Sequence, residues 1–448
     1  MEQKREKFSS GLTIFLATLS SAVGLGNIWM FPYVVGENGG AAFILIYFAC
    51  IALIGIPAVI SEFVIGRGSK VNLLSSISKI TNKKVFKSIG YIGILATYCM
   101  LFFYTIVVGW VYSYVFKSIT GAFNGISPEG AAEIFNATSI GPISPIVWQF
   151  IALSVGASVL AFGVKRGIEK LTKICMPILL ILLTVCVIRS LTLPGAFEGV
   201  SFLLKPDFSK VTFSVVLSAL GLAFFKLSVG TGTLITYSSY YGDDTNLLGT
   251  ASKVAVSDTM VSMLAGLAIF PAVFSFGLQP NSGPSLLFNT VPLIFSKMPG
   301  GSVLSVVFFG LTAIAATMAM ISLLEVLVAV FKEKFNMSRV KALIINVIII
   351  VIVGSLAALS ANPEGMLAHI QLFGYGFFDL FDKFVSLILL PINGLLAIIL
   401  VGHFVSKKFF YNQVTNNGTL KNEKIVNVLY FTMKYITPIL VIIVFIKQ

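Results

Sequence analysis

A lysine lies in the middle of one of the long apolar stretches of this chain. Residues 211–240 are largely apolar, yet they contain the string FFKLSVGTG (224–232), with Lys226 halfway along. On insertion scales a charge at the centre of a membrane helix costs roughly 2.5–3.5 kcal/mol. An ionisable side chain at such a position predicts a functional site and needs a named partner.

Two strings combine glycines with small hydroxyl residues inside apolar segments. They are SSAVGLGNIWMFP (20–32) and KLSVGTG (226–232), each with two glycines at i and i+2. Glycine weakens a helix, and a broken helix persists in a membrane only where it lines a protein-enclosed or watery cavity. The alternative is that these glycines allow close helix packing. Gly-x-Gly places its glycines on different helix faces, which favours two breaks over two packing contacts.

The remaining reactive residue types form no catalytic or metal-binding set. His369 and His403 lie near the ends of apolar segments, and no Ser/His/Asp, Cys/His or paired-carboxylate arrangement accompanies the glycine strings. The cysteines all lie within apolar segments and are expected to be small core residues: Cys50, Cys99, Cys175 and Cys186. We therefore expect neither an enzyme nor a bound cofactor.

The elements that position these residues are membrane helices. Of the 448 residues, 57% are apolar and only 11% are charged, whereas soluble domains have about 25% charged residues. Apolar runs of membrane-spanning length recur along the whole chain. They predict an all-α integral membrane protein with eleven spans, near residues 11–36, 41–66, 86–118, 147–163, 171–190, 211–240, 252–278, 300–331, 339–360, 376–406 and 424–446.

The basic residues are distributed unevenly between the loops. With the N-terminus inside, the cytoplasmic segments contain 22 of the 31 Lys and Arg residues. This positive-inside bias accounts for the net charge of +13 without a nucleic-acid partner. It predicts a multi-pass protein of the plasma (inner) membrane with its C-terminus outside. The first apolar run is long and lacks a small-residue cleavage site, so we interpret it as a span and not as a signal peptide.

The two expected breaks occupy corresponding places in the chain. Span one begins the first set of five spans, and span six begins the second. Paired interrupted helices of this kind predict an inverted-repeat transporter with a binding site near the membrane midplane. The repeats would cover residues 11–190 and 211–406, after a cytoplasmic segment at 1–10, with the last span (424–446) outside them.

Several strings resemble one family of transporters. SAVGLGNIWMFPYVVGENGGAAF, GIPAVISEFVIGR, FYTIVVGW and LITYSSY are similar to the neurotransmitter:sodium symporter family, and in particular to its bacterial LeuT-like members. The resemblance covers almost the whole chain. It implies the LeuT fold, with 5+5 inverted repeats and interrupted helices 1 and 6, and sodium-driven uptake of an amino acid or amine by alternating access.

The resemblance also implies a substrate site. The substrate carboxylate would contact the backbone amides of Leu25 and Gly26 and the hydroxyl of Tyr104, since a half-helix N-terminus favours an anion. Amine-selective members have an aspartate at the position of Gly24, so a substrate with its own carboxylate is expected. The ammonium would contact the carbonyls of Ala22, Phe225 and Ser228, with Phe225 and Tyr104 as the lid. The side-chain pocket would be lined by Ser21, Met100, Phe225, Ser228, Thr231, Ala319 and Leu323.

Two gates follow from the same resemblance. Arg5 and Glu333 would form a cytoplasmic ion pair, although both could also be ordinary solvated charges. On the outer side the family's basic residue is replaced by Met30, opposite Asp382, so that salt bridge cannot form, and the adjacent Lys383 is a poor substitute. Glu62, in span two, is expected to accept hydrogen bonds from the unwound part of span six.

The first sodium site departs from the family pattern. In that pattern the ion is held by the carbonyl of Ala22, by Asn27, by a hydroxyl residue in span six and by the span-seven position occupied by Asp258. Here Lys226 replaces the hydroxyl residue. We hypothesise that its ammonium, a compact cation, replaces the sodium and contacts the substrate carboxylate. The alternatives are a purely structural ion pair with Asp258 and a side chain that reaches toward an interface.

The second sodium site is also altered. Backbone carbonyls would come from Ser20, Val23 and Ala315, but Met318 and Ala319 occupy the two hydroxyl positions. A thioether and a methyl group are poor ligands for a hard cation. Thr317 is one residue away and would point some 100° elsewhere on a regular helix. Chloride dependence is doubtful as well, because Leu222 replaces an expected polar residue, although Ser262 remains.

The leading hypothesis is therefore a secondary transporter of an amino acid or similar zwitterion with weakened or absent sodium dependence. Proton coupling, exchange and uniport stay open as driving mechanisms. The first alternative is a conventional sodium symporter with shifted ligands. A receptor on the same fold is disfavoured by the short loops, and a channel by the compact, lidded site. The expected partners are the substrate and the bilayer, in a monomer or weak dimer.

Overall fold

The computed structural model describes residues 6–141, 143–278 and 286–447. Within these ranges nine helices are long and apolar enough to cross a membrane. They are Ala41–Ser69, Lys84–Ile119, Ser144–Ala161, Val164–Leu191, Leu247–Ser275, Gly301–Lys334, Arg339–Ser360, Phe377–Phe404 and Glu423–Ile446. The largest shift from the expected bounds is at Val164, because a π-helical segment, Val164–Glu169, extends that helix toward its N-terminus.

Two further segments cross the fold as broken helices. The first consists of Gly11–Ala22 and Gly26–Glu37, which together are long and apolar enough to cross a membrane but are bent by 57°. The second consists of α11 (Phe213–Lys226) and α12 (Thr233–Ser238), which are too short to span singly. Nine long helices and two broken ones match the eleven predicted segments. The all-α membrane architecture with interrupted helices one and six is confirmed.

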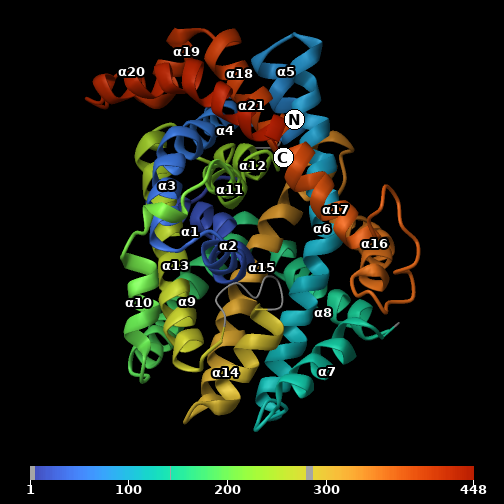
Figure 1. The fold of residues 1–448 in the computed structure, drawn as a ribbon. Helices are drawn as coiled ribbons and strands as arrows, with labels where there is room; N and C mark the ends of the chain where they lie inside the picture. The colour runs from blue at the N-terminus through green and yellow to red at the C-terminus, as the bar shows by residue number, and fades with distance from the viewer. Residues whose placement is uncertain (1–5, 142, 279–285, 448) are drawn as a thin grey trace.

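The broken helices lie at the centre of the molecule (Figure 1). Helix α1 (Gly11–Ala22) packs against α13 (Leu247–Ser275) and α15 (Gly301–Lys334), and α12 packs against α4 (Ile56–Ser69) and α15. In the apolar 18-residue stretch of α15, 83% of the residues are buried, compared with 33% in the corresponding stretches of Ser144–Ala161 and Glu423–Ile446. Helix α15 is therefore a core element, whereas Ser144–Ala161 and Glu423–Ile446 lie at the periphery of the bundle.

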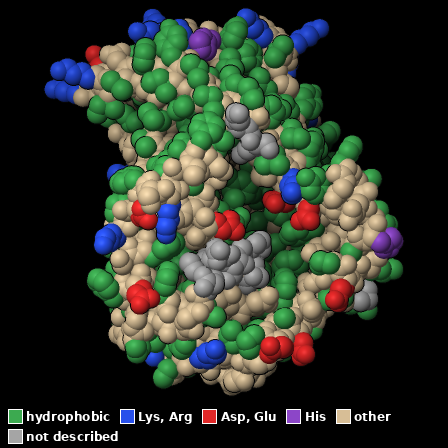
Figure 2. All heavy atoms as spheres, viewed as in Figure 1, with side chains coloured by type: hydrophobic (Ala, Val, Ile, Leu, Met, Phe, Trp, Pro, Cys, Tyr) green, Lys and Arg blue, Asp and Glu red, His purple; other side chains and the backbone are tan. Residues whose placement is uncertain are grey.

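Short helices cap the two ends of the bundle (Figure 1). Helices α5 (Leu73–Ile80) and α19 (Lys407–Val414) lie at one end, and α7 (Pro128–Ser139) and α14 (Val291–Lys297) at the other. Asn72 and Ser406 are the N-caps of α5 and α19, and their side chains accept hydrogen bonds from the first turns. Figure 2 shows Lys and Arg side chains gathered at the end that carries α5 and α19.

Candidate functional site

The break in span six is stabilised by hydrogen bonds from neighbouring helices. Ser228, Gly230 and Gly232 have φ values of 56°, 88° and 77°, so the chain leaves the helix over these residues. The amide of Gly230 donates to Glu62 Oε1 at 2.6 Å, and its carbonyl accepts from Asn393 Nδ2 at 2.6 Å. The predicted break is confirmed, and so is the predicted role of Glu62, because freed backbone groups in a membrane need such partners.

Lys226 lies at the end of α11 and is fully buried. Its Nζ is 2.9 Å from Asp258 Oδ2, and neither side chain has any exposed surface. The ammonium donates a hydrogen bond to Ser262 Oγ. It also lies 5.0 Å from the ring centroid of Phe31 and 5.6 Å from that of Tyr47, within cation–π range. The alternative in which Lys226 reaches toward an interface is therefore wrong.

Asn27 joins the same cluster from the break in span one. Its Nδ2 donates to Asp258 Oδ1 at 2.6 Å and to Ser262 Oγ at 3.0 Å, and its Oδ1 accepts from the amide of Gly24 at 3.1 Å. The side-chain oxygens of Asn27 and Asp258 are thus all engaged within the protein. A sodium ion between these two residues would have to displace the ammonium of Lys226 from Asp258. The ligand set as it stands does not fit the ion.

The buried position of Lys226 also limits what it can contact. A side chain with no exposed surface cannot touch a substrate unless the cluster opens. In this conformation the ammonium instead links α11 to α13 through Asp258 and Ser262. Sequence reasoning missed the contribution of Phe31 and Tyr47, and assigned Ser262 only to a chloride site. The i, i+4 spacing of Asp258 and Ser262 on one helix face was the available signal.

Several predicted substrate residues converge beside this cluster. Ser228 Oγ donates to the carbonyl of Ser21 at 2.8 Å, which joins the two breaks. The amide of Leu25 lies 3.5 Å from the hydroxyl of Tyr104. A Cβ built on Gly24 would lie 3.0 Å from both that hydroxyl and Ala319 Cβ. Helices α1, α6 (Lys84–Ile119) and α15 therefore meet at the amides predicted to bind the carboxylate.

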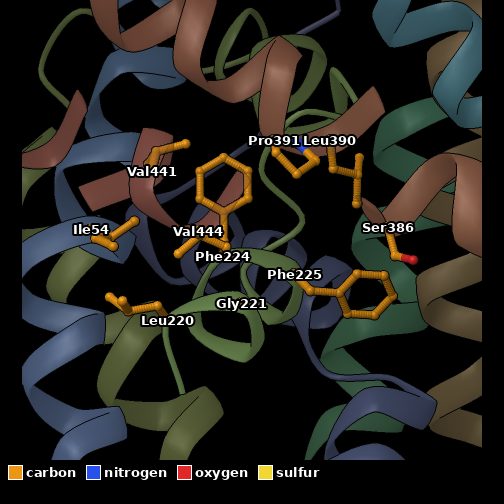
Figure 3. Close-up of a pocket in the computed structure, with 10 residues that line it drawn as sticks. All are labelled: Ile54, Leu220, Gly221, Phe224, Phe225, Ser386, Leu390, Pro391, Val441 and Val444. Atoms are coloured by element: carbon orange, nitrogen blue, oxygen red, sulfur yellow. The ribbon is translucent and has the colours of Figure 1, made fainter. Parts of the chain in front are cut away.

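Other predicted lining residues have more internal roles. The hydroxyl of Thr231 donates to the carbonyl of Ser228 at 2.9 Å, inside its own loop. Met100 and Phe225 are half-buried, and Leu323 is buried. Figure 3 shows Phe224 and Phe225 projecting in different directions from α11. Both line a cavity of about 20 Å³, which is room for a water molecule at most, so this cavity is not the substrate site.

In the predicted second ion site, the two positions expected to carry hydroxyl ligands have no side-chain oxygen. Met318 is buried, and Ala319 offers only its methyl group. The hydroxyl of Thr317 is hydrogen-bonded to Tyr112 at 2.8 Å and to the carbonyl of Ala313 at 2.6 Å. It is therefore committed to Tyr112, a partner that sequence reasoning did not identify.

The predicted gates are only partly described. Arg5 lies outside the described residues, while Glu333 accepts hydrogen bonds from the amide and the side chain of Asn72 at 2.9 and 3.0 Å. On the outer side Lys383 Nζ lies 4.1 Å from the ring centroid of Tyr375. Among the described residues, Lys383 has no carboxylate within 4.0 Å, so it does not replace the outer salt bridge that Met30 cannot form with Asp382.

Contacts that the sequence did not reveal close the lysine-rich end of the bundle, which is the end that carries α5 and α19. Phe8 packs edge-on against Tyr237 and Tyr240, with ring centroids 6.0 Å apart in each case, and its amide donates to the carbonyl of Tyr240. Arg339 forms an ion pair with the buried Glu325, whose Oε1 accepts from the Tyr240 hydroxyl at 2.7 Å. The N-terminal segment therefore packs against Tyr237 of α12, and Tyr240 links it to Glu325 of α15.

Comparison with known proteins agrees with this geometry. The model of the sodium:neurotransmitter symporter family matches residues 5–126 and 131–448. The chain belongs to this family. It is 36% identical to YhdH of Bacillus subtilis (strain 168), an uncharacterized sodium-dependent transporter, over 100% of this chain and 98% of that protein. It is 32% identical to the sodium-dependent transporter MJ1319 of Methanocaldococcus jannaschii, over 89% of this chain and 81% of the relative.

One solved structure extends the comparison to three dimensions. The crystal structure of MhsT in complex with L-phenylalanine matches with a TM-score of 0.91 and 40% identity, covering 99% of both chains. This confirms the LeuT fold and the resemblance inferred from the sequence. As a member of a symporter family with this fold, the protein is a multi-pass membrane transporter.

Proposed function

We propose that this protein transports an amino acid, or a similar zwitterion, by alternating access, and that the Lys226–Asp258 ion pair replaces its first sodium ion. The observation that carries the proposal is the bridge across three segments. Asn27 comes from the break in span one, Lys226 from the end of α11 and Asp258 from α13, and they are joined at 2.6–2.9 Å. A cation held at this point would draw the same three segments together.

Two observations support an amino-acid substrate. MhsT, 40% identical to this chain, is solved with L-phenylalanine. In this chain Gly24 brings no carboxylate of its own, and its neighbourhood has no space for one. The proposed carboxylate ligands are the amides of Leu25 and Gly26 and the Tyr104 hydroxyl. The proposed ammonium ligands are the carbonyls of Ala22, Phe225 and Ser228.

The role of Lys226 is that of an internal counter-charge. Its ammonium would hold Asp258 and Ser262, and these two side chains orient the Asn27 amide. The Oδ1 atom of Asn27 in turn accepts a hydrogen bond from the Gly24 amide in the break, next to the proposed substrate. With both sodium sites short of free side-chain oxygens, transport would depend weakly on sodium. Proton coupling or exchange would then supply the driving force.

A conventional sodium symporter is the second candidate. It is favoured by the relatives, since YhdH and MJ1319 are both named sodium-dependent transporters. In that case the Lys226 cluster would open, or other oxygens would hold the ion. We place the protein in the plasma membrane with the lysine-rich end in the cytoplasm and the C-terminus outside, and we assign residues 11–190 and 211–406 as the inverted repeats.

The experiment that tests the proposal is a ligand-stabilisation screen of the purified protein. Thermal unfolding would be followed over the amino acids in sodium and in choline buffer, because a ligand that binds the folded state raises stability by mass action. We expect one group of amino acids to stabilise the protein equally in both buffers.

The variant Lys226→Thr restores a hydroxyl at the expected ligand position, and it should acquire a sodium-dependent response. Lys173→Thr, a change at a half-exposed lysine of another ion pair, is the matched control and should not. Sodium-dependent stabilisation of the native protein that is lost in Lys226→Thr would contradict the proposal.

A further inference from the structure

Glu62 is a buried carboxyl group with no cation beside it. It lies in α4, within the second span, and is only 1% exposed. Its Oε1 atom accepts the hydrogen bond from the Gly230 amide, whereas Oε2 has no hydrogen-bond partner among the described residues. A carboxylate buried in a membrane protein without a counter-charge is costly, and such a group takes up a proton instead.

The other buried carboxyl groups differ from Glu62 in this respect. Four carboxyl groups are buried in the part of the chain that the structure describes, and three of them form ion pairs. The three pairs are Glu169–Lys173, Asp258–Lys226 and Glu325–Arg339. Glu62 is the fourth, and none of the ion pairs between described residues includes it.

The ionisable groups around α4 are engaged elsewhere. On α4 itself, the guanidinium of Arg67 donates to Gln413 and to the carbonyl of Thr245. On α12, the hydroxyl of Tyr237 donates to Ser322. The basic residues on the elements that pack against α4 are Lys79, Lys253, His403, Lys407, Lys408 and Lys434, and within the described ranges none of them forms an ion pair with Glu62.

The contacts around Gly230 are short of one hydrogen-bond donor. Asn393, in α18 (Leu390–Ile399), donates through Nδ2 to the Gly230 carbonyl, and its buried Oδ1 has no partner among the described residues. A Cβ built on Gly230 would lie 2.7 Å from the carbonyl of Leu390, so this segment packs tightly between α4 and α18. Glu62 Oε2 and Asn393 Oδ1 are therefore two buried acceptors without a donor. A proton on the carboxyl group removes the charge and supplies a donor at the same time.

The Lys226–Asp258 pair is less suited to releasing a proton. Its two charges offset each other, and Ser262 and Asn27 add hydrogen bonds to it. A proton that passed from the ammonium to the carboxylate would stay within the pair. The proton on Glu62 has no such second site beside it, because the hydrogen-bonded neighbour of its carboxyl group is a backbone amide.

We propose that Glu62 carries a proton in this conformation and is the group that binds and releases the coupling proton during transport. This inference rests on the proposed function, because alternating access must move the break in span six away from α4. Water then reaches the carboxyl group and favours its ionised form. The O–H bond breaks, water accepts the proton, and a carboxylate remains. When the break returns, the carboxylate takes up a proton from water on the other side of the membrane.

Infrared spectroscopy of the purified full-length protein tests the protonation without any substrate. A protonated carboxyl group has a carbonyl-stretching band that a carboxylate lacks. We expect Glu62→Gln, which keeps an oxygen for the Gly230 amide, to lose this band at neutral pH. Glu198→Gln, at an exposed glutamate, is the matched control and should lose carboxylate bands instead. Loss of carboxylate bands in Glu62→Gln would overturn the proposal. So would the absence of a protonated band from the native spectrum, a measurement that does not depend on how the variant folds.

Transport by the protein in lipid vesicles tests the coupling. An amino acid found in the stabilisation screen would be supplied in choline buffer. An imposed pH difference should accelerate net uptake by the native protein and by Glu198→Gln. Glu62→Gln should lose this acceleration but still exchange internal for external substrate, because an amide resembles the protonated carboxyl group and has no proton to release. Equal acceleration of Glu62→Gln, or none in the native protein, would overturn the proposal. A native protein that transports no amino acid would contradict the proposed function, and the infrared spectra would still decide whether Glu62 carries a proton.

Discussion

Lys226 Nζ and Asp258 Oδ2 lie 2.9 Å apart, and neither side chain reaches the surface. The ammonium ends α11 just where the chain unwinds, and the carboxylate belongs to the middle of α13. The attraction between the two charges offsets the free-energy cost of burying them. Asn27 donates a hydrogen bond to Asp258, and Ser262 accepts one from Lys226. The contribution of this pair to stability can therefore be measured without knowledge of the substrate.

Removing one member of the pair should destabilise the protein far more than removing both. Lys226→Met leaves an unpaired carboxylate, and Asp258→Asn leaves an unpaired ammonium. Either change should lower the free energy of unfolding by about 3–5 kcal/mol. The double variant should recover most of that loss. Thermal unfolding in detergent would be measured for the native protein, the two single variants and the double variant. Lys173→Met, at a 45% exposed lysine, is the control and should cost under about 1 kcal/mol; an equal loss in Lys226→Met would contradict a buried charge pair.

Gly24 should not tolerate a side chain. A Cβ there lies 3.0 Å from Ala319 Cβ and from the Tyr104 hydroxyl, and overpacking of this kind costs about 1–3 kcal/mol. Gly24→Ala should therefore weaken substrate binding and lower the melting temperature. Adding Ala319→Gly should restore part of both. Gly310→Ala, where a Cβ meets nothing within 4 Å, should leave binding unchanged. Full binding by Gly24→Ala would show that the predicted amides do not hold the carboxylate.

Glu62 should act as a hydrogen-bond acceptor for the unwound segment. Glu62→Gln retains an oxygen for the Gly230 amide, whereas Glu62→Ala leaves that buried donor unpaired, at a cost of about 1–3 kcal/mol. We expect Glu62→Ala to be the less stable of the two in thermal unfolding. If instead Glu62→Gln were as damaging as Glu62→Ala, the charge of Glu62 and not its acceptor oxygen would be the essential property.

The ion pair between Lys70 and Asp243 should make stability depend on acidity. Hydrogen bonding to Lys70 Nζ, 2.9 Å away, lowers the pKa of the Asp243 carboxyl. A carboxyl whose pKa is lower in the folded state stabilises the protein above its unfolded value of about 3.9, and this contribution is lost as the pH falls through the folded pKa. The destabilisation caused by Asp243→Asn should therefore be largest near pH 6 and vanish in strong acid. It should be small throughout, because Asp243 is 81% exposed, and absent in a Lys70→Gln background.

The sequence predicted the membrane architecture closely because the controlling forces are local. A run of apolar residues of span length must form a helix in lipid, whatever its neighbours are. For the same reason Gly230 and Gly232 predicted a break, and Glu62 its partner. The contacts of the N-terminal segment were not predictable. Phe8 meets Tyr237 across more than 200 residues of sequence, and no local pattern encodes such a contact.

The sequence by itself determined that an ammonium lies in the sixth span, the amide of Asn27 in the first and the carboxylate of Asp258 in the seventh. Residue types and hydropathy suffice for that, since they fix which charges enter the membrane. Only the tertiary structure decided where the ammonium points. It faces Asp258, Ser262 and the rings of Phe31 and Tyr47, because the direction of a long side chain depends on packing among helices that are distant in sequence.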